Sequence, residues 1–122
     1  MKKILLADDE DILRMLIIDT LEDEEFIVDE AQDGEEALTL ISQNKYDLLI
    51  LDYMMPILTG LEVIEKVRNE RMDKHLKILM LTAKSQASEQ ENILNAGADY
   101  FMAKPFSPLE LLKKVEEILN EN

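Results

Sequence analysis

Residues 48–52 read Leu48-Leu49-Ile50-Leu51-Asp52, an uninterrupted apolar run that ends in a carboxylate. Two other segments have the same form. Residues 4–7 are followed by Asp8-Asp9-Glu10, and residues 78–81 are followed by Thr82. Short runs that are apolar throughout are typical of strands buried on both faces of a parallel sheet. The three segments therefore predict the central strands of such a sheet.

Two strand-like runs that are more polar, together with five amphipathic stretches, complete an alternating pattern. Residues 26–31 and 98–103 have strand character but carry acidic residues, so we expect them at the sheet edges. With residues 3–7, 47–51 and 77–81, they alternate with helices predicted over 11–23, 34–43, 60–70, 85–96 and 108–120. This alternation favours an α/β fold, a five-stranded parallel sheet with helices on both faces. If the three apolar strands are central and the two polar strands lie at the edges, the strand order is 2-1-3-4-5, that of a doubly wound, flavodoxin-like sheet.

The composition limits the classes of protein to which the chain can belong. Its 122 residues (14.1 kDa) fit one domain, residues 1–122, and 47% of them are hydrophobic, enough for a core. The absence of cysteine excludes disulfides and thiolate metal sites. Acidic residues outnumber basic ones by 27 to 13, and the net charge of −14 argues against direct nucleic-acid binding. No apolar run is long enough for a membrane span, so we expect a cytoplasmic protein without membrane contact.

The acids that follow the first and third strands point to a metal site. In open α/β sheets, ligands bind beyond the carboxyl ends of the strands where the strand order reverses, here between these two strands. Asp8-Asp9-Glu10 and Asp52 should therefore converge. Acids at a helix start can simply cap the helix, but Asp52 ends an apolar strand. Converging carboxylates repel one another, and oxygen ligands without histidine or cysteine favour Mg²⁺.

Two further residues at this edge of the sheet suit a phosphoryl group. The fourth strand ends at Thr82 and the fifth at Lys104. A hydroxyl and an ammonium that face carboxylates and Mg²⁺ form a complementary shell for phosphoryl oxygens. Asp52 can then act as the nucleophile, because aspartyl phosphate is an established covalent intermediate.

Six short motifs follow one another along the chain. They are residues 5–10 (LLADDE), 31–38 (AQDGEEAL), 52–56 (DYMMP) with Gly60, 81–83 (LTA), 97–99 (GAD) and 104–106 (KPF). Each motif alone is weak, but in this order and spacing they are specific. Over essentially its whole length the chain resembles the receiver domain of bacterial two-component response regulators, and in particular the single-domain receivers of chemotaxis.

The resemblance implies a role for each acid of the predicted site. Asp52 would accept a phosphoryl group from a sensor histidine kinase or a phosphotransfer protein. Mg²⁺ would be bound by Asp9, Asp52 and the backbone carbonyl of Met54, with a water between the ion and Asp8. The protein would be a signalling switch rather than an enzyme, catalysing only the phosphorylation and dephosphorylation of Asp52. Its altered surface would be read by a downstream protein, which the sequence does not name.

The resemblance also implies how phosphorylation is sensed. Thr82 would bond one phosphoryl oxygen after transfer, and Lys104 would pair with another. Phe101 stands at the position of the family's switch aromatic, where most relatives have tyrosine, so a hydroxyl cannot report its state here. The peptide bond before Pro105 would be cis. His75 is the only histidine and lies in a charged stretch, so the phosphoryl donor must be another molecule.

The first predicted helix has more apolar surface than a core-facing stripe requires. The residues expected to face the sheet lie at helical spacing: Leu13, Leu16, Ile17 and Thr20. Ile12 and Met15 would then point outward beside Leu16. An exposed apolar pair can be without function, but from the resemblance we interpret Ile12, Met15 and Leu16 as a docking strip for the kinase.

Two other functions remain open on the sequence alone. A Mg²⁺-dependent phosphohydrolase also forms aspartyl phosphate, but its Asp-x-Asp pattern lacks the second aspartate because Met54 stands there. An interaction module that works without phosphorylation would not need the complete set of aspartates, Thr82 and Lys104, so this set argues against that function. The chain ends at Asn122 after the last predicted helix, with no output domain. The initiating methionine and the polar end favour a stand-alone receiver over one cut from a longer regulator.

Overall fold

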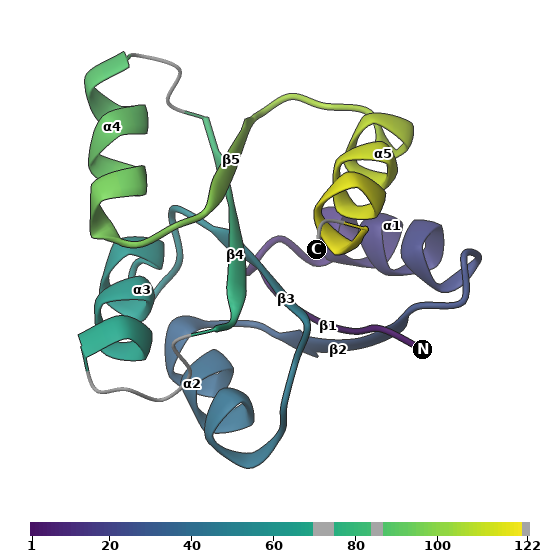
Figure 1. The fold of residues 1–122 in the computed structure, drawn as a ribbon, viewed down its shortest axis with the longest axis horizontal. Helices are drawn as coiled ribbons and strands as arrows, with labels where there is room; N and C mark the ends of the chain where they lie inside the picture. Colours follow the sequence, from purple (N-terminus) through teal and green to yellow (C-terminus); the bar gives the residue numbers. More distant parts are fainter. Residues whose placement is uncertain (70–74, 84–86, 121–122) are drawn as a thin grey trace.

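Five parallel strands in the order β2-β1-β3-β4-β5 form the centre of the computed structural model, which describes residues 1–69, 75–83 and 87–120 (Figure 1). The elements in chain order are β1 (Lys3–Ala7), α1 (Asp11–Glu22), β2 (Ile27–Ala31), α2 (Gly34–Gln43), β3 (Leu48–Asp52), α3 (Gly60–Asn69), β4 (Lys77–Thr82), α4 (Ala87–Ala96), β5 (Tyr100–Ala103) and α5 (Pro108–Leu119). The predicted flavodoxin-like sheet is confirmed, with the two polar strands β2 and β5 at its edges.

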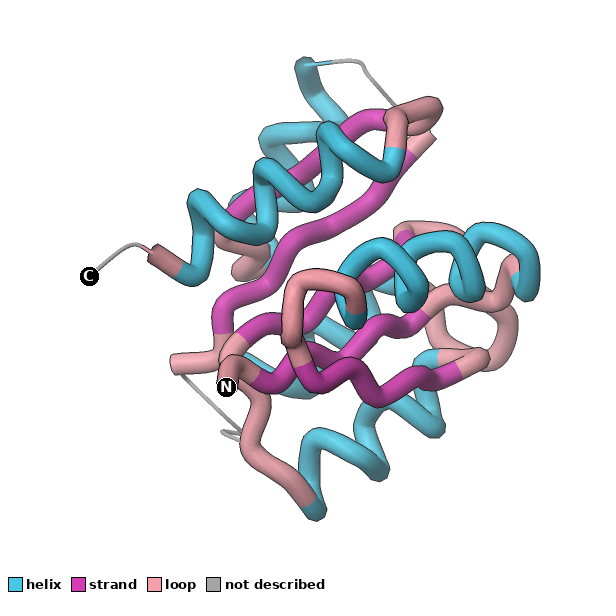
Figure 2. The backbone as a smooth tube through the Cα atoms, turned by 90° about the vertical axis from the view of Figure 1, so that its right-hand side faces the viewer, coloured by secondary structure: helices cyan, strands magenta, loops and turns pink. Residues whose placement is uncertain are grey.

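The helices cover the sheet on both faces. Helices α1 and α5 pack on one face, and α2, α3 and α4 pack on the other (Figures 1 and 2). All five residues of β3 are buried, as expected for a strand covered from both sides. Within the residues that the structure describes, no helix combines the length and the apolar character needed to cross a lipid bilayer.

The register of the sheet brings the carboxyl ends of the strands to one edge. Ala7, the last residue of β1, lies beside Leu51, and Asp52 ends β3 directly after it. Thr82, the last residue of β4, lies beside Ala103 of β5. The chain segments that leave these strands therefore meet above the same edge of the sheet.

Side-chain caps set the starts of two helices. The Asp33 carboxylate accepts a hydrogen bond from the backbone N–H of Glu36 (2.8 Å), which starts α2. The Ser107 hydroxyl accepts from the backbone N–H of Glu110 (3.1 Å), and Pro108 follows it as the first residue of α5. Both caps satisfy N–H groups that a helix start leaves without partners inside the helix.

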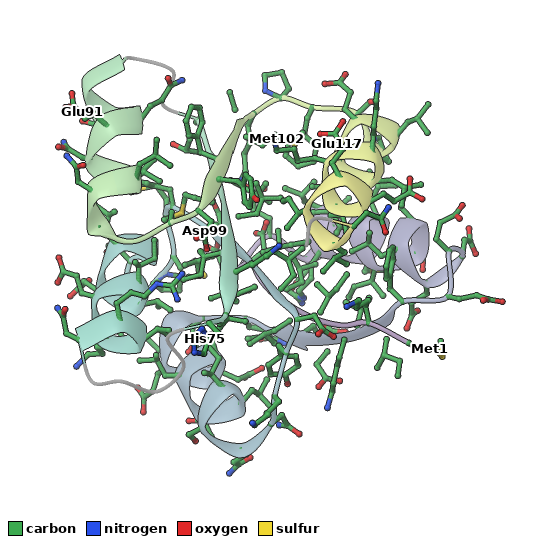
Figure 3. The ribbon with its side chains drawn as sticks, in the orientation of Figure 1. Met1, His75, Glu91, Asp99, Met102 and Glu117 are labelled. Atoms are coloured by element: carbon green, nitrogen blue, oxygen red, sulfur yellow. The ribbon has the colours of Figure 1, made fainter. Side chains whose placement is uncertain are left out.

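The last strand starts later than the sequence predicts. The segment predicted over residues 98–103 is a strand only from Tyr100. Gly97 has a φ of 121°, which turns the chain between α4 and β5. The Asp99 carboxylate, labelled in Figure 3, accepts hydrogen bonds from the backbone N–H of Ile78 (2.8 Å) and from Arg68 (3.0 Å). These bonds hold Asp99 in a turn ahead of the strand.

The other boundaries differ from the prediction by about one residue, as helix and strand ends commonly do. Strand β2 begins at Ile27 rather than 26, β3 covers 48–52 rather than 47–51, and β4 extends to Thr82. Helices α1 and α5 each end one residue before the predicted end. The predicted helix end Glu70 and helix start Ser85 lie outside the described residues.

Helix α1 is rotated relative to the prediction. Its buried residues are Arg14, Ile17 and Leu21, whereas Leu16 is 46% exposed and Thr20 is half-buried. The expectation that Leu16 faces the sheet is therefore wrong, whereas Leu13 and Ile17 pack into the core on this face as predicted. The physical reason is Arg14, whose guanidinium donates to the backbone carbonyl of Asp8 and to the side chains of Asp11 and Glu30. These bonds allow a charged side chain to be buried on a helix face where the pattern predicts only apolar ones.

Candidate functional site

Three aspartates converge at the carboxyl edge of the sheet. Asp8 and Asp9 follow β1, and Asp52 ends β3. Each offers a carboxylate oxygen, and these oxygens lie within 4.8 Å of one another. Asp8 and Asp52 are buried, with exposed fractions of 0% and 4%, while Asp9 is exposed. Like charges this close repel strongly, so the cluster needs a compensating cation.

Asp8 is the most deeply placed of these acids. Its Oδ1 accepts a hydrogen bond from the backbone N–H of Glu10 (2.8 Å). Its Oδ2 is buried and has no hydrogen-bond partner among the described residues. Burial raises the pKa of Asp8 to about 6, and the carboxylate of Asp52 acts in the same direction. The N–H of Glu10 and the ammonium of Lys104 offset part of this rise.

Lys104 is the cation that the structure places on Asp52. Its Nζ donates to Asp52 Oδ1 (3.1 Å) and lies 3.7 Å from Glu10 Oε2. Burial raises the pKa of Asp52, and the Lys104 ammonium and the backbone N–H of Met54, which both bond the carboxylate, offset only part of this rise. Burial lowers the pKa of Lys104, but the surrounding carboxylates of Asp52, Asp8 and Glu10 outweigh it and raise the pKa above its usual value.

Thr82 and Lys104 enter the site from neighbouring strands. Thr82 is fully buried at the end of β4, and its backbone carbonyl accepts from the N–H of Lys104 (2.7 Å). The peptide bond between Lys104 and Pro105 is cis. The side chain of Met54 is 63% exposed. Phe101 lies in β5, half-buried against the core shared with α2, α3 and α4.

A glycine allows the loop after Asp52 to fold back on the site. The backbone N–H of Gly60, at the start of α3, donates to the carbonyl of Tyr53 (2.9 Å). A Cβ at position 60 would lie 2.6 Å from the backbone oxygen of Asp52, closer than real Cβ atoms approach other atoms. Glycine is therefore required where the first turn of α3 passes the end of β3.

Arg14, which hydropathy does not single out, holds the acidic loop in place. Its side chain is 6% exposed and donates to the backbone carbonyl of Asp8 (2.7 Å), to Asp11 Oδ1 (2.7 Å) and to Glu30 Oε1 (2.8 Å). The signal was present in the spacing, because positions 14, 17 and 21 lie on one face of a helix. Arg14 thus ties the start of α1 and the neighbouring strand β2 to the residue that carries the Asp8 carboxylate.

Replacing Arg14 with methionine should weaken Mg²⁺ binding about five- to tenfold, because the loop that carries Asp8 loses charge-assisted hydrogen bonds. Calorimetric titration of Mg²⁺ measures this. Arg68→Met is the matched control, since Arg68 bonds Gly97 and Asp99 near the opposite edge of the sheet. Both variants should lose thermal stability, but only the first should lose metal affinity. Equal Mg²⁺ affinity in the two variants would refute a positioning role for Arg14.

The exposed apolar side chains of α1 lie on the helix that follows the acidic loop. Ile12, Met15 and Leu16 have exposed fractions of 85%, 63% and 46%. The structure thus places all three predicted docking residues at the surface. Contiguous apolar surface on a soluble protein is typical of an interaction site.

The donor set fits a hard divalent cation. Asp8, Asp9 and Asp52 supply only carboxylate oxygens, the ligands that Mg²⁺ prefers. The unpartnered Oδ2 of Asp8 is a buried acceptor that a cation, or a water bound to one, would satisfy. The residues present therefore fit the Mg²⁺ expected from the sequence.

Known proteins match the chain over nearly its whole length. A family model for the response regulator receiver domain matches residues 4–116. The transcriptional regulatory protein ResD of Bacillus subtilis (strain 168) is 40% identical over 117 residues, which are 96% of this chain and 48% of ResD. This chain therefore spans about half the length of that curated relative.

Solved structures are similar to this fold as well. The chemotaxis response regulator CheY4 of Vibrio cholerae superposes with a TM-score of 0.92 at 35% identity, covering 97% of this chain and 98% of CheY4. The response regulator TrrA of Thermotoga maritima, solved in complex with Mg²⁺ and BeF, gives a TM-score of 0.84 at 40% identity. That match covers 97% of this chain and 99% of TrrA. The comparisons of sequence and of fold thus both match this chain to response regulators.

Proposed function

Since the chain belongs to the response regulator receiver domain family, we propose that Asp52 accepts a phosphoryl group and that this domain, residues 1–122, switches its protein-binding surface in response. The proposal rests on one observation above all. Asp52 is a buried carboxylate at the end of β3, with Lys104 bonded to it at 3.1 Å and two further aspartates beside it. Receiver domains of two-component systems interact with histidine kinases or phosphotransfer proteins, and we assign one of these as the cytoplasmic donor.

In the proposed reaction, a carboxylate oxygen of Asp52 attacks the phosphorus of the donor. A P–O bond to Asp52 forms while the bond from phosphorus to the donor breaks, and the electron pair leaves with the donor. That bond is P–N in phosphohistidine and P–O in acetyl phosphate. Lys104 neutralises one phosphoryl oxygen, and the Thr82 hydroxyl donates to another after transfer. The domain would catalyse only this transfer and the later hydrolysis at its own Asp52.

We assign Mg²⁺ to Asp9, Asp52 and the backbone carbonyl of Met54, with a water between the ion and Asp8. The fit of the three carboxylates and the Mg²⁺ complex of TrrA support this assignment. When bound, the ion neutralises charge on the phosphoryl oxygens. The carboxylates of Asp8 and Asp9 would orient the ion, and Lys104 holds Oδ1 of the nucleophile Asp52.

The direct test is intact mass after incubation with acetyl phosphate, with and without Mg²⁺. We expect the mass increase of one phosphoryl group only when Mg²⁺ is present. Peptide mapping should then place the group on Asp52. Labelling that does not depend on a divalent metal, or a phosphoryl group on another residue, would overturn the proposal.

Substitutions within the site should separate metal binding from phosphoryl binding. Asp9→Ala should weaken Mg²⁺ binding by about tenfold or more, because a carboxylate ligand is lost. Thr82→Ala should leave Mg²⁺ affinity unchanged, and Lys104→Ala should raise it slightly, because the ammonium repels the cation. Calorimetric titrations decide between these effects. Equal losses in all three variants would mean that the roles are wrongly assigned.

Phe101 is our candidate for the residue that carries the switch to the surface. In the register of the sheet, Phe101 pairs with Met80 and Thr82 pairs with Ala103, so Phe101 and Thr82 lie on the same face. If Thr82 moves toward a phosphoryl group, the ring of Phe101 can fill the space behind it. Because phenylalanine has no hydroxyl, packing alone separates the two ring positions.

Docking and switching should be separable by two substitutions. Ile12→Asp should slow transfer from a cognate histidine kinase roughly tenfold or more, because an apolar contact is lost, while labelling by acetyl phosphate stays unchanged. Phe101→Ala should leave both labelling rates largely intact and weaken binding of the downstream protein. The two rates and the partner affinity are measured for both variants. If Phe101→Ala slowed labelling as strongly as it weakened partner binding, the division between site and output surface would be wrong.

A further inference from the structure

A second candidate site lies at the amino edge of the sheet, the edge opposite the aspartates. A cavity of about 630 Å³ opens there between the starts of β1, β3 and β4 and the end of α5. Figure 3 labels two of the residues that line it, His75 near the start of β4 and Met1 near the start of β1. Its volume is in the range typical of small-molecule sites.

The lining of this cavity has the opposite charge from the rest of the protein. Among the described residues that line it, four are lysines, Lys2, Lys3, Lys45 and Lys77, and one, Asp47, is an acid. In the whole chain, acidic residues outnumber basic ones by 27 to 13. A cationic cavity concentrates anions locally even on a strongly acidic protein, and the net charge of the chain does not reveal it.

Two of the four ammonium groups are held in place by the fold. Lys3 Nζ donates to Asn44 Oδ1 (3.4 Å) and lies 5.2 Å from the centroid of the Tyr46 ring. Lys77 Nζ donates to the backbone carbonyl of Ile118 (3.1 Å). Because β1 and β4 carry these lysines and their side chains are already ordered, an anion would bind with less loss of conformational freedom.

The single carboxylate in the lining is partly engaged. Asp47 Oδ2 accepts a hydrogen bond from the backbone N–H of Lys3 (2.8 Å). Lys3 Nζ also lies 3.7 Å from Asp29 Oδ2, so one of the four lysines is already paired with an acid. The described lining still carries more positive than negative charge, because its four lysines outnumber its one carboxylate.

We propose that this cavity binds a small organic phosphate with at least two negative charges. Lysine is a compact point charge that binds phosphate without the fixed geometry of an arginine fork, and the described lining contains four lysines and no arginine. The acidic surface outside the cavity disfavours a long phosphate backbone. Met1 and Leu119 add apolar surface for the organic part of the ligand. The inference is independent of the proposed phosphorylation of Asp52.

The test is a calorimetric titration of the unphosphorylated full chain with ADP and with inorganic tripolyphosphate, in a chelating buffer that removes Mg²⁺. Wild type should bind one ADP saturably. The variant Lys45→Gln/Lys77→Gln should bind it about tenfold more weakly, because two charged donors are lost. The matched control Lys66→Gln/Lys113→Gln removes the same charge outside the cavity and should stay within about twofold of wild type. Thermal melting of all three proteins excludes loss of the fold.

The two probes and a lipid arm identify the source of the phosphate. Tripolyphosphate binding that the lysine pair weakens as strongly as ADP binding supports a site for the phosphate groups themselves. Equal weakening by both double variants would overturn the proposal, because net charge rather than the cavity would then explain the binding. Binding to phosphatidylglycerol vesicles without saturable binding of either probe would also overturn it, in favour of a membrane surface.

Discussion

Asp52→Asn should reduce phosphoryl labelling by acetyl phosphate to the background level. The amide has nearly the shape of the carboxylate, but its oxygen is too weak a nucleophile to attack phosphorus. The amide oxygen can still accept the hydrogen bond from Lys104 that Asp52 Oδ1 accepts at 3.1 Å. We therefore expect a folded protein that has lost only its chemistry.

A matched variant distinguishes this effect from a general loss of charge. Asp47→Asn removes an acid from the residue just before β3, at the edge of the sheet opposite Asp52, and should label normally. Intact mass gives the extent of labelling, and circular dichroism shows that both variants are folded. Undiminished labelling of Asp52→Asn would assign the phosphoryl group to another residue and overturn the proposed function.

Asp8→Asn should stabilise the metal-free protein at neutral pH by about 1–3 kcal/mol. Asp8 is fully buried, and its pKa is raised from 3.8 to about 6. In the unfolded chain, Asp8 ionises near its ordinary value. Between pH 3.8 and about 6, the folded state therefore binds the proton more tightly than the unfolded state, and the free energy of unfolding falls as pH rises. Above this window the whole penalty is present.

The pH dependence of the two proteins separates this cause from others. Urea denaturation should give wild type and Asp8→Asn similar stabilities below about pH 4 and a difference that grows until about pH 6. Saturating Mg²⁺ should reverse the order at neutral pH, because wild type binds the ion more tightly. Asp19→Asn, which removes a carboxylate at an exposed position of α1, is the control for a general loss of negative charge. A stability difference that is constant across pH would rule out the Asp8 carboxylate as its cause.

The sequence predicts the sheet and the convergence of the acids for one physical reason. Strands that are apolar throughout must be buried on both faces, and parallel strands must end at one edge. The convergence of Asp8, Asp9 and Asp52 can therefore be predicted without any knowledge of side-chain contacts. In the structure, one carboxylate oxygen of each lies within 4.8 Å of the others. Thr82 and Lys104 reach the same edge by the same argument.

The remaining features depend on contacts between segments that are distant in the sequence. The buried position of Arg14 is decided by the carbonyl of Asp8 and by Glu30 on another strand, so hydropathy alone assigns that helix face wrongly. The cationic cavity is assembled from the starts of β1, β3 and β4, the residues just before them and the end of α5. Taken alone, each of its lysines has the sequence context of an ordinary solvated residue. Lys3 and Lys77 acquire a common role only when β1 and β4 lie in one sheet.

The opposite charges at the two edges of the sheet give the molecule a permanent electric dipole along its strands. Aspartates gather where β1 and β3 end, and lysines gather where β1 and β4 begin, about 16 Å away for five-residue strands. In the field of a charged partner, such a molecule rotates before the two surfaces touch. A basic partner surface would meet the aspartate edge first, and added salt would weaken this orientation over the Debye length. The direction of the strands thus decides which edge of the sheet a charged partner meets first.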